Sequence, residues 1–566
     1  MLSSVNRALN RVLSEQITLL IYAVIIGIGG GYGAVAFRWM ITKFTYLFFH
    51  QTQAQLASFH GIRSFFVPII GGLIVGPIVY FFAREAKGHG VPEVMVAITQ
   101  NKGLIRPRIV IVKALASAIT LGSGGSVGRE GPIVQIGSAW GSTLGQLLHV
   151  SERTIKTLVA CGAAAGIAAT FNAPIGGALF AFEIVLGSFE LANVSAIVIS
   201  SVISAAIGRV YFGNFASFPL PHYTVTTTVV ILLLFAILGI MGGLYGFFYI
   251  RVLFVFEDFF DRLKKIPEWL KPAVGGIGLG VIGYFFPQLF GVGYPTVEHA
   301  LTNHLALGLL IALLFLKLFM TSLTLAAGGS GGVFAPGLFM GSMLGGAYGL
   351  ILKMIFPHLP VSDGVFAAVG MAAVFAGSAH APITAMVMLF EMTGNYQLIL
   401  PLMLASVIAT AISVRISRES IYTMKLKRRG VDILRKRNPD RLAAVLVNEI
   451  MPKERLTING ELTLREALKV IAKTPEWFAN VNDSRGNILG SVARSQILEG
   501  IQLGFGETML LTLLPDKIGH IHEEATLSEA TTMMNDLNTT YLLVVDGNDV
   551  AKGVIGSSDI VHAYQF

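Results

Sequence analysis

The run Gly128-Arg129-Glu130-Gly131-Pro132 has the residue types of an anion site. Pro132 suits the first turn of a helix, the glycines let backbone N–H groups approach a ligand, and the N-terminus of a helix carries partial positive charge. Because Glu130 is itself an anion, its carboxylate can occupy the place of a bound anion and leave when it is protonated or displaced. The alternative is a carboxylate that only caps the helix.

Two further clusters have a similar pattern. Gly332-Val333-Phe334-Ala335-Pro336 follows the first cluster at an offset of 204 residues and has Phe334 in the place of Glu130. It can present the amides of Val333 and Phe334 without a competing charge. Gly88-His89-Gly90-Val91-Pro92 offers another helix start, at which His89 can donate to an anion, titrate, or cap the helix. No second His lies at ligand spacing, so we expect no metal site.

A second repeated pair indicates that the chain contains a duplicated half. Asn172-Ala173-Pro174-Ile175 precedes an apolar run that reaches Glu183, and His380-Ala381-Pro382-Ile383 precedes one that reaches Glu391, at an offset of 208 residues. Paired halves whose apolar segments are interrupted by Gly and Pro at matching positions indicate a midplane ion or substrate site in a transporter. The alternative for any single cluster is a turn outside the membrane.

The elements that position these clusters must be membrane helices. Residues 1–420 contain 39 charged residues (9%), whereas residues 421–566 contain 35 (24%), so a membrane part precedes a soluble part. The basic excess lies beside apolar segments, which excludes a nucleic-acid footprint and matches the Lys and Arg bias of cytoplasmic loops. Cys161 is the only cysteine, which excludes an intrachain disulfide.

The order of the segments gives the expected domains. Residues 1–16 form a cytoplasmic N-terminus, 17–424 a membrane domain with halves at 17–212 and 226–416, 425–446 a basic linker, and 447–502 and 515–566 two α/β modules. The apolar segments are expected at 18–49, 66–83, 109–121, 132–148, 158–187, 194–212, 226–256, 272–290, 304–326, 335–356, 365–392 and 398–416. In the tail we expect helices at 464–471 and 527–537 and strands at 488–492, 541–545 and 553–555.

With these clusters and Glu419-Ser420-Ile421-Tyr422, the chain resembles the CLC family of chloride channels and chloride/proton antiporters, followed by a pair of CBS modules. The resemblance implies an α-helical polytopic homodimer, with one pathway per subunit and two inverted halves of tilted, broken helices. It makes Glu130 the gating glutamate, and it implies a chloride site built by the Val333 and Phe334 amides and the Tyr422 hydroxyl. The expected anion-binding residues also include His89, Gly90, Arg129 and Gly131.

Two positions depart from the family pattern. The family usually has Ser where this chain has His89, and that Ser is an anion ligand linked to chloride preference, as a Pro there is to nitrate. Proton-coupled members usually carry a glutamate where Ile184 stands, as an apolar residue does in passive channels. This favours uncoupled flow. Glu183 is either an alternative proton route or a structural carboxylate that bonds buried backbone.

The CBS pair retains half of the family's nucleotide-binding pattern, a Ser or Thr three residues before an Asp. The first module has Ala493 and Gln496 there, and the second has Gly556 and Asp559. We therefore favour a dimerising or gating-support role, with an adenine nucleotide at Asp559 as the alternative, and expect no resident cofactor.

The sequence thus predicts transport of chloride or a similar small anion, with voltage- or pH-dependent gating by Glu130. Passive flow is favoured, chloride/proton exchange is the alternative, and a CBS-bearing cation channel is more distant because the membrane part has only 15 acidic residues. A membrane metalloprotease needs His-Glu-x-x-His, but His522-Glu523 is followed by Thr526, so no enzyme activity or catalytic residue is expected. A regulatory scaffold without transport is the remaining alternative. We expect the cell (inner) membrane, with a cytoplasmic tail.

Overall fold

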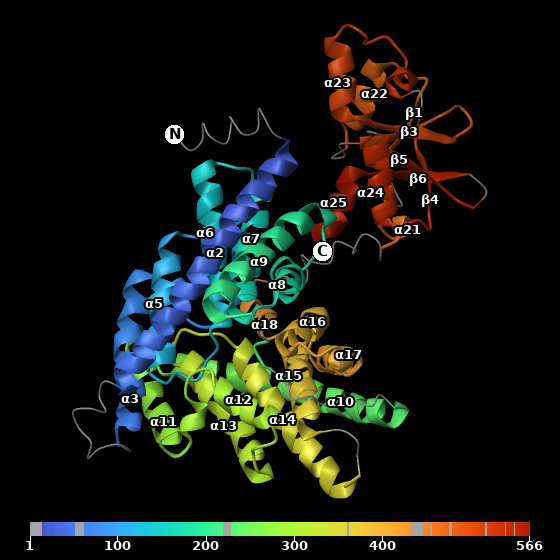
Figure 1. Cartoon of the computed structure of the whole chain (residues 1–566). Helices are drawn as coiled ribbons and strands as arrows, with labels where there is room; N and C mark the ends of the chain where they lie inside the picture. The colour runs from blue at the N-terminus through green and yellow to red at the C-terminus, as the bar shows by residue number, and fades with distance from the viewer. Residues whose placement is uncertain are drawn as a thin grey trace. The chain divides into compact units, whose positions relative to one another are not determined.

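The computed structural model describes residues 14–50, 62–214, 216–218, 228–358, 362–431, 445–452, 455–474, 478–515, 518–537, 539–547 and 550–565 (Figure 1). The chain forms two compact units, Met1–Ile433 and Leu434–Phe566. Most of the expected N-terminal segment and the basic residues Arg435, Lys436 and Arg437 of the linker lie outside the described residues.

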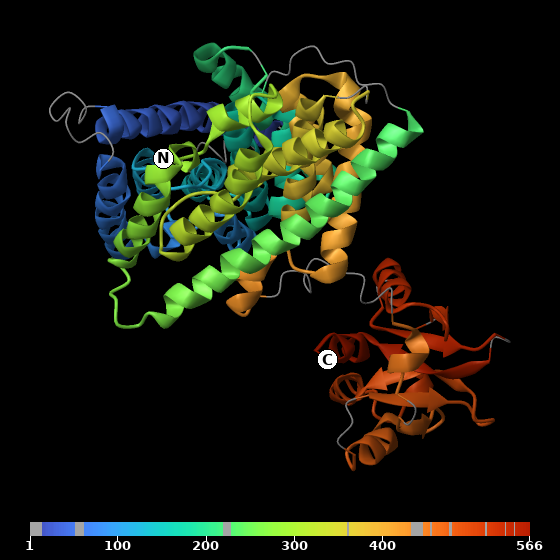
Figure 2. The ribbon, with the colours of Figure 1, turned by 90° about the horizontal axis from the view of Figure 1, so that it is seen from below.

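The first unit is α-helical. Its described residues include eight helices that are long and apolar enough to cross a membrane. The first half contains α2 (Glu15–Thr45), α3 (Ile62–Pro77), α4 (Val91–Thr99), α5 (Arg108–Gly122), α6 (Glu130–Leu148), α7 (Glu152–Phe171), α8 (Pro174–Phe180) and α9 (Leu191–Phe212). The second half contains α10 (Val229–Arg262), α11 (Lys271–Phe285), α12 (Tyr294–Leu301), α13 (Leu307–Ala326), α14 (Phe334–Ile355), α15 (Asp363–Ala379), α16 (Pro382–Thr393), α17 (Ile399–Ile416) and α18 (Thr423–Arg428). The helix α10 runs along one edge of this unit as the long green helix of Figure 2.

Two apolar segments are broken in the structure at the repeated proline-containing clusters, as the sequence predicts. The apolar stretch 158–187 divides at Asn172 into α7 and α8, and 365–392 divides at His380 into α15 and α16. Both residues end a helix in the left-handed conformation, with φ of 56° in each case. Pro174 and Pro382 then begin the next helix, because a proline lacks the N–H that is unsatisfied at a helix start.

The two halves are related by an approximate two-fold axis. Ser126 Oγ donates to the carbonyl of Leu289 at 2.8 Å, and Ser330 Oγ donates to that of Ala86 at 2.7 Å. Ser330 lies 204 positions after Ser126, and Leu289 lies 203 after Ala86, so each half makes to the other the contact that it receives. Such reciprocal pairs are the property of a two-fold interface.

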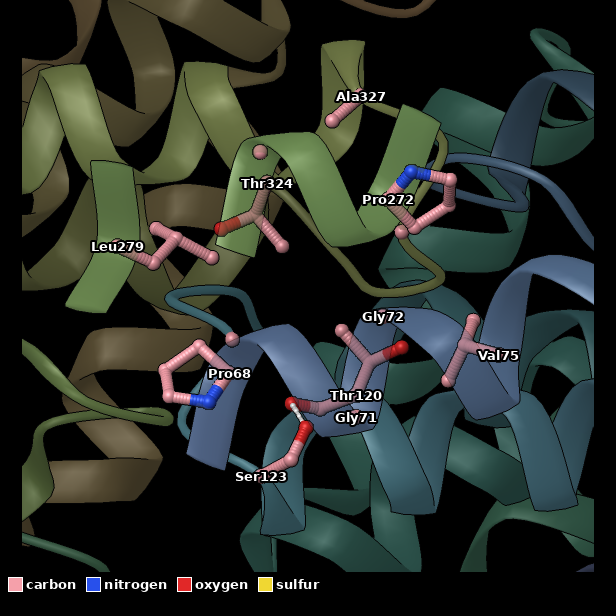
Figure 3. A pocket seen from close by; sticks show the side chains of 13 residues that line it. Pro68, Gly71, Gly72, Val75, Thr120, Ser123, Pro272, Leu279, Thr324 and Ala327 are labelled. Atoms are coloured by element: carbon pink, nitrogen blue, oxygen red, sulfur yellow. Dashed lines mark hydrogen bonds between the residues drawn. The ribbon is translucent and has the colours of Figure 1, made fainter. Parts of the chain in front are cut away.

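A small cavity lies at the seam between the halves (Figure 3). Pro68 and Thr120 line one side, and Pro272 and Thr324, each 204 positions later, line the other. Its volume of about 20 Å³ has room for about one water molecule. The repeat therefore extends upstream of the clusters, into α3 and α11.

The second unit consists of two similar α/β modules. The first contains β1 (Thr457–Asn459), α22 (Leu464–Ile471), β2 (Phe478–Asn482), β3 (Ile488–Ala493) and α23 (Arg494–Gln502). The short helix α21 (Val447–Ile450) precedes it in the chain but packs on the second module, where Val447 lies in the core and donates its N–H to Ala525. The second contains β4 (His520–His522), α24 (Leu527–Asp536), β5 (Tyr541–Val545), β6 (Ala551–Gly556) and α25 (Ser557–Gln565). Each sheet pairs its first two strands in parallel and its last two antiparallel. The expected helices and strands of the tail are confirmed, with β6 starting two residues earlier than predicted.

Candidate functional site

The three glycine-rich clusters of the sequence meet inside the membrane unit. Gly128 N–H donates to the carbonyl of Gly332 at 2.8 Å, and Gly332 N–H donates back to Gly128 at 2.6 Å. Gly88 bonds the residues just before Gly332. Its N–H donates to the carbonyl of Gly329, and its carbonyl accepts the N–H of Gly331. The starts of α4, α6 and α14 therefore converge on one buried point.

The starts of α4, α6 and α14 meet at a point called the crossing below. Glycine is required there because the backbones are almost in contact. A Cβ on Gly131 would lie 2.0 Å from the carbonyl oxygen of His89, and one on Gly90 would lie 2.8 Å from that of Gly131. Gly90 also has φ of +81°, which side chains disfavour. Gly90 and Gly131, both predicted site residues, thus allow the starts of α4 and α6 to approach one another.

The Glu130 carboxylate lies at the start of α14, although Glu130 itself begins α6. Its side chain is buried, Oε2 accepts the N–H of Ala335 at 3.3 Å, and Oε1 accepts the hydroxyl of Tyr294 at 3.0 Å. Ala335 belongs to the first turn of α14, where partial positive charge attracts an anion. A carboxylate here occupies a place suited to a small anion.

Val333 and Phe334 supply the start of α14. Val333 is its N-cap, and its carbonyl accepts the hydroxyl of Tyr249 at 3.2 Å. The Phe334 ring packs edge-on against Phe375, with centroids 4.3 Å apart. This packing fixes the first turn, whose amides are among those that have no partner within a helix.

His89, in the loop just before α4, and Tyr422, the N-cap of α18, are brought together. Both are buried, and their ring centroids are 6.0 Å apart. Neither ring nitrogen of His89 has a hydrogen-bond partner within the part of the chain that the structure describes. A buried donor without a protein partner needs another one, and a bound anion is of the right chemical kind.

Arg129 points away from this pair. Its guanidinium lies 5.1 Å from the ring centroid of Tyr294, and Nη2 donates to the carbonyl of Thr170 at 3.4 Å. Its positive charge therefore acts beside Glu130 rather than beside His89 and Tyr422.

Two buried lysines are not predicted from the sequence, although the repeat contains a signal for them. Lys113 Nζ donates to the carbonyls of Ala86 and Gly88 at 2.9 and 2.7 Å, and Lys317 lies 204 positions later. Each lies inside an apolar helix, where an ionisable group indicates function or a specific partner. Lys113 holds the loop that carries His89 in place.

Glu183 and Glu391 form a reciprocal pair. Glu183 accepts the N–H groups of Ile383 and Thr384 at 3.2 and 2.6 Å, at the start of α16. Glu391 accepts two N–H groups at the start of α8, at 3.1 and 2.7 Å. This is the geometry of carboxylates that cap helices of the opposite half. The neighbouring Ile184 side chain is buried.

Asp559, the predicted nucleotide residue, is engaged by protein groups. Its two carboxylate oxygens accept from Arg455 Nη2 at 2.8 and 2.9 Å, and Oδ2 also accepts the N–H of Gly556 at 2.8 Å. Gln496, at the matching place in the first module, bonds the N–H of Ala493 at 2.8 Å. Among the described residues, no group of three or more His, Cys, Asp or Glu side chains is placed to hold a metal ion.

Comparison with known proteins gives two family matches. A family model described as "Voltage gated chloride channel" matches residues 71–414, and one described as "CBS domain" matches residues 516–565. The first match covers more than half of the chain.

Individual relatives agree with these matches. A "Putative chloride channel protein ClcB-like" of Ralstonia nicotianae is 33% identical over 74% of this chain and 98% of that protein. An "H(+)/Cl(-) exchange transporter ClcA" of Vibrio cholerae is 36% identical over 66% of this chain and 80% of that protein. The solved structure of "a slow cyanobacterial Cl-/H+ antiporter" has 27% identity and a TM-score of 0.68, and the match covers 74% of this chain and 98% of that one.

Proposed function

Because the chain belongs to the CLC family of anion transporters and carries a CBS pair, we propose that it moves chloride or a similar small anion past the crossing of α4, α6 and α14, with Glu130 as the gate. The observation that carries this proposal is the Glu130 carboxylate bonded to the first turn of α14. A negative group there competes with an anion for the same amide. Protonation of the carboxylate, or its displacement by an arriving anion, frees the place.

The anion would be held by the amides of Val333 and Phe334, the Tyr422 hydroxyl and the His89 ring. The approach of His89 to Tyr422, at 6.0 Å between ring centroids, supports a shared ligand between them. His89 then replaces the hydroxyl that the family's usual Ser provides.

Passive flow is the form of transport that we favour, because Ile184 cannot carry a proton and Glu183 is bound to the start of α16. Chloride/proton exchange is the second candidate, since several relatives at 34% to 36% identity are named exchange transporters. Exchange in this chain needs a proton route that bypasses Ile184, with Glu183 or water as carriers.

The reversal potential of the reconstituted protein separates the two forms. In planar bilayers with opposed chloride and proton gradients, we expect a reversal potential equal to the chloride equilibrium potential, and the same value for Glu183→Gln. A potential displaced by the proton gradient in the wild type would contradict passive flow. If Glu183→Gln then restored the chloride value, Glu183 would be the proton route.

The selectivity contribution of His89 is measurable by anion binding. Loss of a hydrogen bond to a charged ligand costs about 1.5 kcal/mol or more, so His89→Ala should weaken chloride binding roughly tenfold in calorimetric titration. His89→Ser should restore much of the affinity. His304→Ala, at an exposed histidine that bonds Thr302, is the matched control and should bind as the wild type does. Unchanged affinity in His89→Ala would make His89 a packing residue.

The orientation of the protein in the membrane is inferred from its basic residues. Lys425, Arg428 and Arg429 form a basic group at the end of the membrane unit, and such groups face the cytoplasm. We therefore propose a multi-pass protein of the cell (inner) membrane with a cytoplasmic N-terminus and CBS tail, acting as a homodimer. For the CBS pair we propose a supporting role without a nucleotide, because the Asp559 carboxylate is already paired with the Arg455 guanidinium.

A further inference from the structure

A fourth helix start joins the crossing, in addition to the three clusters predicted from the sequence. Gly291-Val292-Gly293-Tyr294-Pro295 begins α12 and is the counterpart of Gly88-His89-Gly90-Val91-Pro92, 203 positions earlier. Lys317 Nζ donates to the carbonyls of Leu289 and Gly291 at 3.2 and 2.9 Å, as Lys113 does in the first half. Tyr294 therefore brings a hydroxyl to the place at which the first half has an apolar Val91.

The Tyr294 ring is held by several contacts. Its centroid lies 5.0 Å from that of Phe218, which packs against it edge-on, and 5.1 Å from the guanidinium of Arg129. At the N-cap, Gly293 has φ of +83°, so the chain turns sharply into α12 just before the tyrosine. The hydroxyl is thereby directed at Glu130 Oε1, at 3.0 Å.

Resting on the gating role proposed for Glu130, we propose that Tyr294 is a positioning residue that holds the Glu130 carboxylate in its blocking position and sets the pH at which the gate opens. A phenol that donates to a carboxylate stabilises the ionised form, since a protonated carboxyl is a much weaker acceptor. A proton that opens the gate must therefore compete with this bond.

Other groups also act on Glu130, and their effects differ from that of Tyr294. The titratable and charged groups that face it from the surrounding elements are Arg129, Tyr249, Tyr294, Lys317 and Tyr422. The two cations favour the ionised carboxylate through space and remain in place when only the tyrosine hydroxyl is removed. Tyr294→Phe keeps the ring and its contacts, so a change in this variant reports the hydroxyl.

The test is chloride efflux from proteoliposomes across a series of pH values. Tyr294→Phe should raise flux at neutral pH several-fold and move the pH of half-maximal flux upward by roughly one unit. Tyr245→Phe is the matched control, because it removes another tyrosine hydroxyl of the membrane unit, one that donates to the carbonyl of Leu314 at 2.9 Å. Its pH profile should equal that of the wild type.

A double variant shows whether the effect passes through Glu130. Glu130→Gln combined with Tyr294→Phe should give the profile of Glu130→Gln alone. A Tyr294→Phe profile equal to the wild type, or an equal effect of this change in the Glu130→Gln background, would overturn the role of Tyr294 and leave the gate intact. Absence of chloride flux from the wild type would overturn the proposed function itself, and Tyr294 with it.

Discussion

Glu130→Gln is expected to raise chloride flux at pH 7.5 by roughly tenfold or more and to abolish its dependence on pH. The change removes the charge that competes with an anion for the first turn of α14 and keeps the size of the side chain. A hydrogen bond to a charged group is worth about 1.5–3 kcal/mol, and each 1.4 kcal/mol changes an equilibrium tenfold. The neutral amide therefore resembles the protonated, open gate at every pH.

The measurement is efflux from proteoliposomes between pH 4.5 and 8, with Glu152→Gln as a matched control. Glu152 is exposed and pairs with Lys156 at 2.8 Å, so its loss should leave the profile unchanged. The competing interpretation, a carboxylate that only caps a helix, makes a different prediction. Lower thermal stability of Glu130→Gln with an unaltered pH profile would support the cap and contradict the gate.

The convergence of α4, α6 and α14 can be predicted from the sequence because each start carries its own Gly and Pro signature. The hydrogen bonds between Gly128 and Gly332 place two of these starts together, as the duplicated cluster suggests. The start of α12 has the same signature, but it becomes visible only when Gly291-Val292-Gly293-Tyr294-Pro295 is aligned with the first cluster of the other half. Its contact with Glu130 joins residues 164 positions apart, which local pattern cannot show.

Ion pairs between residues far apart in the chain also cannot be predicted from the sequence. Asp559 has the right position for a nucleotide residue, but only the structure shows that Arg455, 104 positions earlier, binds both of its oxygens. Glu183 shows the opposite case. The repeat of this residue at Glu391 suggested a structural carboxylate, and each is bonded to backbone amides of the opposite half.

The second large effect is expected at a glycine contact between helices. A Cβ on Gly137 of α6 would lie 2.1 Å from the carbonyl oxygen of Gly162 on α7, and one on Gly162 would lie 2.0 Å from that of Gly137. Gly341 and Gly370 repeat this contact between α14 and α15, at 2.4 and 2.3 Å. Because lipid is as apolar as the helix surfaces, close packing is a main source of stability between membrane helices.

Gly137→Val should therefore destabilise the membrane unit by about 3 kcal/mol or more, because overpacking against backbone cannot be relieved by a rotamer change. The midpoint of thermal aggregation in detergent, followed by size-exclusion chromatography, should fall, or folded protein should be absent. Gly33→Val is the matched control, since a Cβ at Gly33 of α2 meets nothing within 4 Å. Because both changes add the same side chain to a helix, their difference isolates the contact with α7. Equal midpoints would show that α6 and α7 can separate without loss, and that the glycines are not required for packing.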